Sequence, residues 1–354
     1  MKFIHIADVH LGATPDFNMP WGAERKKEIW SNFHNILSIC NNEKVDLLLI
    51  AGDLFHRQPL VRELKEVNYA FSKLNTTQVV LMAGNHDFIS DRSNYQGFEW
   101  NENVHMFMED RIGAFHFEEL GVQIYGLSYR TREITEPLYD MVRPRDDMFI
   151  NILLAHGGEE KDIPFNRKKL LDSGFDYYAL GHFHKPALIC DRMAYCGSQE
   201  PLDKNETGER GYILGEIIQN GRVKKTIIRF VPNSIREYKR CILTVDGNTT
   251  NGSLQDQAKE VIQTNGTSHI YSFYIQGIRD EVIHFDKEAI MELGNVLEIE
   301  DQSVPDYNFD VLYQENADNI IGMYIKKIKE NAVHDEMARK ALYYGMEALL
   351  HAKN

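Results

Sequence analysis

Five short apolar runs constrain the fold of this chain more than any other feature, because each ends within a residue or two in a side chain that can bind a metal. The runs precede, in order, Asp8 and His10, Asp53, Asn85 and His86, His156, and His182 and His184. An apolar run of about four to six residues predicts a buried strand. Ligands of an open α/β sheet bind at the carboxyl ends of its strands, so we expect all five clusters to meet at one edge of the sheet.

Each cluster has an ordinary structural alternative when it is taken alone. A Gly-Asp pair after a strand is also a common turn or helix cap, Asn85 is also a turn former, and a single histidine is often a surface or core residue. Glycine directly precedes Asp53, Asn85 and His182, however, and it lets the backbone approach a site closely. The spacing of Asp8 and His10, repeated by the pair that starts at His182, puts both side chains on one side of an extended backbone. Taken together, the clusters favour one shared centre.

Residues 1–234 alternate apolar runs with helical patterns, which predicts an α/β domain. The predicted strands are Lys2–Ala7, Asp46–Ala51, Gln78–Ala83, Val122–Gly126, Met148–Ala155, Tyr177–Leu180, Ala187–Tyr195, Gly211–Ile218 and Val223–Val231. The predicted helices are Glu24–Cys40 and Leu60–Leu74. We expect the strands from Ala187 onward to extend the sheet in the antiparallel direction.

Pro232, Asn233 and Ser234 predict a domain boundary before residue 235. Residues 235–305 predict a small α+β domain, with strands near Tyr238–Val245, His269–Ile275 and Val296–Ile299 and a helix near Leu254–Gln263. Residues 306–354 predict an acidic linker and two amphipathic helices, Asn319–Glu330 and Asp335–His351. The apolar stripes of these helices either bind a partner or pack on the same chain, and the sequence leaves both open.

The composition excludes several classes of protein. No apolar run approaches the roughly 20 residues of a membrane span, and the opening residues do not read as a secretory signal. We therefore expect a cytoplasmic protein with no membrane partner. Its four cysteines form no CxxC pair and are expected to be reduced. The net charge of −14 disfavours generic nucleic-acid binding. The first 235 residues carry 27 Lys and Arg against 33 Asp and Glu, however, so charge does not exclude a DNA substrate.

The clusters, read in order, resemble the motifs of a known family. Asp8-Val9-His10, Gly52-Asp53, Gly84-Asn85-His86-Asp87, His156 and Gly181-His182-Phe183-His184 are similar to the motifs of calcineurin-like metallophosphoesterases. The longer segments 8–12, 52–56 and 179–184 resemble SbcD-type nucleases, which process DNA double-strand breaks, and the segment 197–211 resembles their YhaO-like branch. The resemblance implies a layered α/β sandwich of mixed β-sheets flanked by helices, with a small α+β capping domain that positions DNA and C-terminal helices.

Seven candidate ligands exceed what one divalent ion can use, and a two-metal site needs a bridging carboxylate, for which we choose Asp53. By the resemblance, Asp8, His10 and His184 complete one metal site, and Asn85, His156 and His182 complete the other. Oxygen and nitrogen ligands without thiolate suit Mn²⁺, Fe or Zn. The resemblance favours manganese.

Three further residues have candidate catalytic roles. His86 adjoins the ligand set without being needed in it, so we expect it to stabilise the transition state or to protonate the departing 3′ oxygen. Asp87 either orients His86 through a hydrogen bond or has only a structural role in the turn. By the resemblance, His56 contacts substrate near the metals; the alternative is a surface histidine.

The sequence therefore predicts a two-metal DNA nuclease, a double-strand exonuclease and single-strand endonuclease of DNA repair and recombination. By the resemblance, it works with an SbcC-like coiled-coil ATPase on which its C-terminal helices dock, and it is a possible homodimer. One alternative is a phosphoesterase for small nucleotides or phosphoproteins. Another is a non-catalytic scaffold on the same fold.

Overall fold

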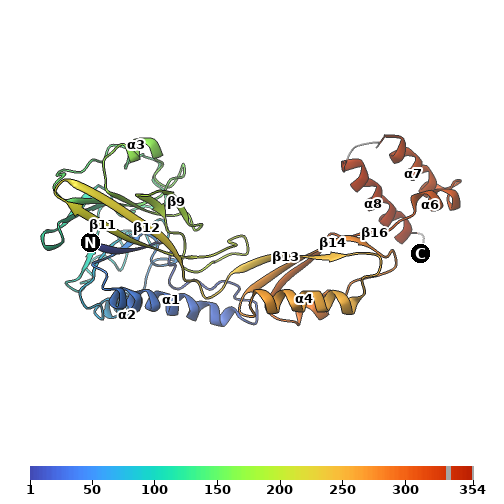
Figure 1. Ribbon diagram of the computed structural model, residues 1–354, viewed down its shortest axis with the longest axis horizontal. Coiled ribbons are helices and arrows are strands. Elements are labelled where there is room, and N and C mark those ends of the chain that lie inside the picture. Colours follow the sequence, from blue (N-terminus) through green and yellow to red (C-terminus); the bar gives the residue numbers. More distant parts are fainter. Residues whose placement is uncertain (332–335, 353–354) are drawn as a thin grey trace. The chain divides into compact units, whose positions relative to one another are not determined.

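The computed structural model describes residues 1–331 and 336–352, and its chain divides into two compact units, Met1–Tyr238 and Lys239–Asn354 (Figure 1). Asp335, where the last predicted helix begins, lies outside the described residues. The roles expected for residues 1–234 as a nuclease domain, 235–305 as a DNA-positioning domain and 306–354 as a partner-docking segment stay predictions.

The first unit contains two six-stranded mixed sheets. One consists of β1 (Lys2–Ile6), β2 (Leu47–Ala51), β3 (Gln78–Met82), β4 (Val104–Met106), β11 (Gly211–Asn220) and β12 (Val223–Pro232), in the order β12-β11-β1-β2-β3-β4. The other consists of β5 (Gly113–Phe117), β6 (Val122–Gly126), β7 (Ile150–His156), β8 (Tyr177–Gly181), β9 (Ala187–Cys190) and β10 (Met193–Tyr195), in the order β5-β6-β7-β8-β10-β9. The 3₁₀ turn η1 (Glu118–Leu120) joins β5 to β6.

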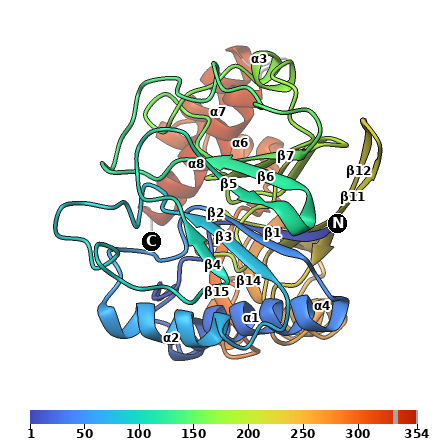
Figure 2. The ribbon, with the colours of Figure 1, turned by 90° about the vertical axis from the view of Figure 1, so that its left-hand side faces the viewer.

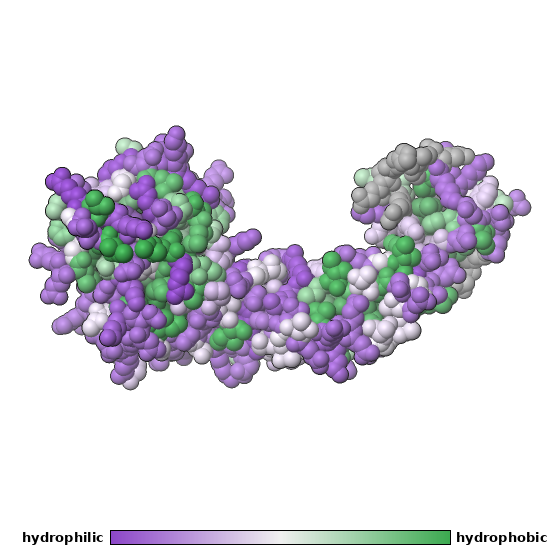
Figure 3. Space-filling view, in the orientation of Figure 1, coloured by the Kyte–Doolittle hydropathy of each residue, from purple (hydrophilic) through white to green (hydrophobic). Residues whose placement is uncertain are grey.

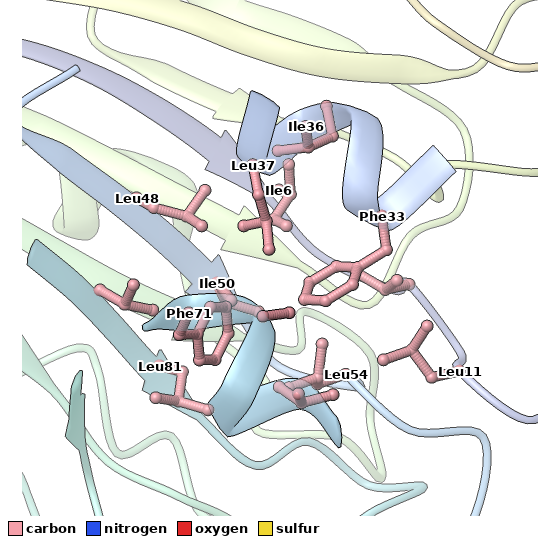
Figure 4. Packing of buried hydrophobic residues seen from close by; sticks show 14 of the residues in the cluster. Ile6, Leu11, Phe33, Ile36, Leu37, Leu48, Ile50, Leu54, Phe71 and Leu81 are labelled. Carbon is pink, nitrogen blue, oxygen red and sulfur yellow. The ribbon is translucent and has the colours of Figure 1, made fainter. Parts of the chain in front are cut away.

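Two helices, α1 (Gly22–Glu43) and α2 (Val61–Phe71), cover one face of the first sheet (Figure 2). The apolar residues of α1 recur at steps of three and four, so they form one stripe that faces the strands. Phe33 and Ile36 of α1 and Phe71 of α2 pack against Leu48 and Ile50 of β2 (Figure 4). Because β2 is buried on both faces, its sequence is a continuous apolar run.

The opposite face of the first sheet packs on the second sheet. Phe3, Leu49 and Val80 from the first sheet meet Ile124 and Ile152 from the second in one buried cluster. The far face of the second sheet is covered by α3 (Arg167–Leu171) and by residues 127–142. The expected layered sandwich with flanking helices is confirmed.

Most predicted strands and helices of this unit are confirmed within a few residues, but the short helix α3 and the turn η1 were not predicted, and the strands differ in three further respects. Ala187–Tyr195 is not one strand but the hairpin of β9 and β10, which turns at residues 191 and 192. The antiparallel expectation holds for β11 and β12 but is wrong for β10, which pairs in parallel with β8. Strands β4 and β5 were not predicted, because β4 has three residues and β5 has no fully buried one.

The second unit contains a sheet with the order β13 (Tyr238–Val245), β14 (Ile270–Arg279) and β15 (Val296–Asp301), and β16 (Val304–Pro305) pairs with β14. Helices α4 (Asn251–Asn265) and α5 (Lys287–Met291) pack on it through Leu254, Ala258 and Ile290. Strands β13, β14 and β15 and helix α4 were predicted, but the two-residue strand β16 was not. The short helix α5 was not predicted either.

Three helices end the described chain, α6 (Phe309–Glu315), α7 (Ile320–Asn331) and α8 (Glu336–His351). Ile321 and Ile325 of α7 pack against Leu342 and Met346 of α8, so the two predicted apolar stripes contact each other. Helix α6 lies in the stretch that was expected to be a linker. None of the described helices combines the length and apolarity needed to cross a bilayer.

Candidate metal centre

The candidate ligands come from the carboxyl ends of strands in both sheets of the first unit. Asp8, Asp53 and Asn85 lie in the loops that follow β1, β2 and β3. His156 is the last residue of β7, and His182 directly follows β8. The expectation of one sheet edge is therefore wrong. The strand ends belong to two sheets packed face to face, because β5 and β6 begin a second sheet after β4.

The loops that carry these residues do not have the extended backbone expected for the pairs at 8/10 and 182/184. The φ angles of Asp8, His10, Asp53 and His182 are 49°, 52°, 51° and 95°. Positive φ is unfavourable for residues other than glycine, and such residues cluster at functional sites. The pairs thus reach the centre through turned rather than extended backbone.

The glycines before these residues do permit the expected close approach. A Cβ at Gly52 would lie 2.3 Å from His156 Nδ1, and one at Gly84 would lie 2.2 Å from Asp53 Oδ1. A Cβ at Gly181 would lie 2.0 Å from a backbone oxygen of β2. Any side chain at these positions would therefore separate the loops that form the centre.

Asp53 lies between two groups of ligand atoms. Its Oδ2 is 3.9 Å from His10 Nε2 and 3.5 Å from His156 Nε2. On one side, His10 Nε2 is 3.0 Å from His184 Nε2. On the other, His156 Nε2 is 3.0 Å from Asn85 Oδ1. One carboxylate is thus within reach of two sets of metal-binding atoms.

The carboxylates and imidazoles that could hold a metal form several close groups. Within each group the ligand atoms lie within 4.8 Å of one another. Among the described residues there are four such groups: Asp8 with His10 and His184; Asp8 with Asp53 and His156; His10 with His56 and His86; and His182 with Glu159 and Asp162. The ring of His182 lies 5.3 Å from that of His156. The structure therefore brings all seven predicted ligands into one neighbourhood, although the His182 ring faces two carboxylates that were not predicted.

Burial and neighbouring charge shift the pKa values in opposite directions. Burial alone would raise the pKa of Asp53, but His156, His10 and His86 hold it well below its usual range. Burial alone would lower the pKa of His156, but Asp53 raises it to about 9. Burial holds the pKa of His10 well below its usual value despite the nearby Asp53. In the metal-free protein the centre therefore combines an ionised Asp53 and a charged His156 with a neutral His10, and the neutral imidazole is the form of histidine that binds metals.

Hydrogen bonds orient two of the imidazoles. His184 Nδ1 is 2.6 Å from Glu206 Oε1, and His156 Nδ1 is 2.8 Å from the Ala51 carbonyl oxygen. Each ring therefore donates from Nδ1 and keeps Nε2 for the centre, as second-layer oxygens do for metal-bound histidines. The sequence did not predict that Glu206 contacts His184, because the two residues are 22 positions apart and Glu206 follows no predicted strand.

The three candidate catalytic residues have different surroundings. His86 is partly exposed, and its Nδ1 is 3.1 Å from the His56 carbonyl oxygen. The His56 ring stacks on the His86 ring at 5.3 Å, and His56 Nδ1 is 3.4 Å from His10 Nδ1. His56 and His86 therefore both lie at the candidate metal centre.

Of the two roles that the sequence left open for Asp87, its contacts agree with the structural one in the turn rather than with a hydrogen bond to His86. The Asp87 carboxylate is fully buried and accepts hydrogen bonds from the Gly84 and Phe55 amides and the Tyr95 hydroxyl, at 2.8, 3.2 and 2.8 Å. Its two oxygens are occupied by these three donors, and the His86 Nδ1 pairs instead with the His56 carbonyl oxygen. Asp87 joins the loops after β2 and β3.

Comparisons with known proteins agree with this arrangement. A family model described as calcineurin-like phosphoesterase matches residues 1–186, which include all seven predicted ligands. The uncharacterized metallophosphoesterase YhaO of Bacillus subtilis is 31% identical over 236 residues, 60% of this chain and 57% of that protein. The DNA double-strand break repair protein Mre11 is 29% identical over 255 residues in Archaeoglobus fulgidus, 64% of this chain and 56% of that protein. Mre11 of Methanocaldococcus jannaschii is 30% identical over 226 residues, 58% of each chain.

These matches span less than two thirds of each relative. A solved structure, titled as GAP50, the anchor in the inner membrane complex of Plasmodium, aligns with a TM-score of 0.38 and 12% identity over 66% of this chain and 85% of that chain, too weak a likeness for argument. The match to the family model covers more than half of the 354 residues. The chain belongs to the calcineurin-like phosphoesterase family.

Proposed function

We propose that this protein is a two-metal DNA nuclease. The observation that carries the proposal is the position of Asp53, whose Oδ2 lies 3.9 Å from His10 Nε2 and 3.5 Å from His156 Nε2. A carboxylate between two nitrogen groups is what a bridge between two cations requires. Asp8, His10 and His184 then hold one ion, and Asn85, His156 and His182 hold the other.

The chemistry of this ligand set supports divalent ions, with Mn²⁺ as our choice. Carboxylate, amide and imidazole groups without thiolate fit Mn²⁺ better than a soft metal. When bound, two such ions supply an activated water molecule and offset the charge that develops on a phosphodiester under attack. Each assigned ligand lies at a strand end or within a few residues after one, where the strand holds the adjoining backbone in place.

His86 is placed to handle the proton of the leaving oxygen. Its Nδ1 lies 3.1 Å from the His56 carbonyl oxygen, which only accepts hydrogen bonds, so Nδ1 carries a hydrogen. Nε2 is then the nitrogen that exchanges a proton with substrate. The stacked His56 ring holds the His86 ring from one side and extends the surface that substrate meets.

DNA is the proposed substrate because the curated relatives at about 30% identity include Mre11 proteins, which are named for DNA double-strand break repair. We include double-strand exonuclease and single-strand endonuclease activity, a role in DNA repair and recombination, and a cytoplasmic location. An SbcC-like coiled-coil ATPase is the proposed partner, and Ile320, Met323 and Tyr344 of α7 and α8 are exposed apolar residues for such a contact. A homodimer is also part of the proposal.

The test compares hydrolysis of end-labelled duplex DNA with that of a small phosphodiester, using metal-free protein to which Mn²⁺ is added. We expect cleavage of DNA that depends on Mn²⁺. The Asp53→Asn variant should bind both ions more weakly by calorimetry, because a bridge serves both sites, whereas Asp172→Asn, at an exposed position, should not. Rapid hydrolysis of only the small diester would favour a small-molecule phosphoesterase. Cleavage of neither substrate by the metal-loaded protein would favour a scaffold.

A further inference from the structure

A loop after β7 presents two carboxylates to the ring of His182. Glu159 Oε2 lies 3.5 Å and Asp162 Oδ2 lies 3.7 Å from His182 Nε2. Both distances are at or beyond the upper limit of a hydrogen bond, so the attraction is the electrostatic one between the Nε2–H of the ring and two carboxylates. Asp162 is the more enclosed of the two, with a side chain 14% exposed against 57% for Glu159.

The backbone of the loop fixes where the carboxylates stand. Gly157 and Gly158 have φ angles of 136° and 123°, which turn the chain sharply after β7. The Gly158 amide donates to the Asp162 carbonyl oxygen at 2.8 Å, and the Asp162 amide donates to the Glu159 carbonyl oxygen at 3.2 Å. The Tyr195 hydroxyl also donates to the Gly157 carbonyl oxygen at 3.0 Å. The loop is thus closed on itself and anchored to β10.

The position of His182 is fixed from the other side. Its backbone amide donates to both carboxylate oxygens of Asp8, at 3.0 and 3.2 Å. Its ring lies edge-on to that of His156, at 5.3 Å. Because Nε2 faces Glu159 and Asp162, Nδ1 is the nitrogen left for a cation held jointly with His156.

The two proposed ions have different numbers of carboxylate ligands, and the carboxylates of Glu159 and Asp162 add negative charge near the ion that has fewer. In the proposed assignment both ions share Asp53, and Asp8 is a ligand of the ion held by His10 and His184, although its carboxylate also lies within 4.8 Å of the ligand atoms of Asp53 and His156. The other ligands assigned to the second ion, Asn85, His156 and His182, include no further carboxylate. A divalent ion there has little negative charge in direct contact, and the two loop carboxylates supply it from behind His182.

We propose that Glu159 and Asp162 are positioning residues for the second cation: they hold His182 with a hydrogen on Nε2, so that Nδ1 is the ligand atom. The inference rests on the proposed two-metal function. Outer carboxylates of this kind orient the ring and increase its basicity, and their removal commonly weakens metal binding by about 10- to 100-fold.

The test uses the full chain with Glu159→Gln, Asp162→Asn and both together, each nearly isosteric, and Glu160→Gln as the control from an exposed position in the same loop. Calorimetric titration of metal-free protein with Mn²⁺ should show that the double variant binds one of two ions about 10- to 100-fold more weakly, with the other unchanged. Glu160→Gln should match the unmodified chain. Equal affinities in all variants would overturn the proposal.

A second measurement needs no metal and no activity. Nitrogen-15 NMR of the His182 ring in metal-free protein near pH 8 should report hydrogen on Nε2, and the double variant should shift towards hydrogen on Nδ1. The reversed variant Glu159→Asp with Asp162→Glu should restore much of the Nε2 form. If the calorimetric titration shows three Mn²⁺ ions and the double variant loses only the third, Glu159 and Asp162 bind that ion directly and the positioning role is overturned. If DNA is not cleaved while the tautomer and the second ion depend on the loop, the nuclease proposal fails and this inference stands.

Discussion

His5 provides a sensitive test of the packing between the two sheets. It lies on β1, fully buried, and its Nδ1 is 2.8 Å from the Tyr177 hydroxyl on β8. Its Nε2 is buried without a hydrogen-bond partner among the described residues. Burial lowers the pKa of His5 from 6.5 to about 3, because a charged imidazole between the sheets would lose its hydration.

The sign and size of the effect on stability follow from these values. The unfolded chain takes up the His5 proton below about pH 6.5, whereas the folded chain does so only near pH 3. Stability contributed by the neutral form is therefore present above about pH 6.5 and is lost as the pH falls towards 3. Between about pH 7 and pH 5 the loss amounts to about 2 kcal/mol of unfolding free energy.

The assay is urea unfolding of metal-free protein, followed by tryptophan fluorescence. Trp21, Trp30 and Trp100 are the three tryptophans of the chain and all lie in the first unit, so the signal reports that unit alone. His5→Gln removes the titrating group. Between about pH 7 and pH 5, the unfolding free energy of this variant should therefore decrease by about 2 kcal/mol less than that of the unmodified chain. His34→Gln, at an exposed position on α1, should follow the unmodified chain. Parallel pH profiles for the His5 variant and the unmodified chain would refute the reasoning.

Three other predictions follow from the contacts of the first unit. His86→Ala should retain both metals yet lose roughly 100-fold or more of hydrolysis, and loss of metal together with activity would reject a proton-donor role. Glu200→Ala leaves the buried Arg25 guanidinium with Glu28 at 2.8 Å as its carboxylate and deprives the Asn32 amide of an acceptor, so urea unfolding should show a loss of about 1–3 kcal/mol; an unchanged unfolding free energy would contradict a stabilising role for the buried Glu200. Gly52→Ala places a Cβ 2.3 Å from the imidazole that ends β7 and should weaken Mn²⁺ binding in calorimetry. Gly97→Ala controls for positive φ, because nothing lies within 4 Å of its Cβ, and equal effects of the two variants would reject the steric argument.

Much of the first unit could be predicted because its strands are buried on both faces. The run Leu47–Ala51 is buried at every position, so apolar composition alone marks it as a strand. The pattern of apolar residues does not identify strands that are short or half-exposed, such as Val104–Met106 and Gly113–Phe117. Missing these two strands concealed the start of the second sheet, and it is the reason that one sheet edge was expected instead of two.

The candidate centre was predictable to the extent that its residues follow strands. Asp53 and His156 stand at strand ends, where spacing and the preceding apolar runs identify them. Glu159 and Asp162 lie in a loop, where nothing distinguishes them from the other acids among the 53 in the chain, and Glu206 lies in the segment that resembles the YhaO-like branch, which gave it no contact with His184. Only the folded backbone shows that they stand behind the imidazoles of His182 and His184, so the outer layer of a site of this kind requires a structure.

Buried charge and backbone strain at the centre argue for a binding role independently of any likeness to other proteins. Asp8 and Asp53 are each 1% exposed, and two carboxylates buried in one site repel each other. Asp8, His10, Asp53 and His182 also have positive φ, at a cost of roughly 1–3 kcal/mol for each such residue. Apolar side chains on ordinary backbone would stabilise the same meeting of two sheets better. Cations between the carboxylates would offset the repulsion and hold the strained loops, so both features are accounted for by metal binding and neither by packing.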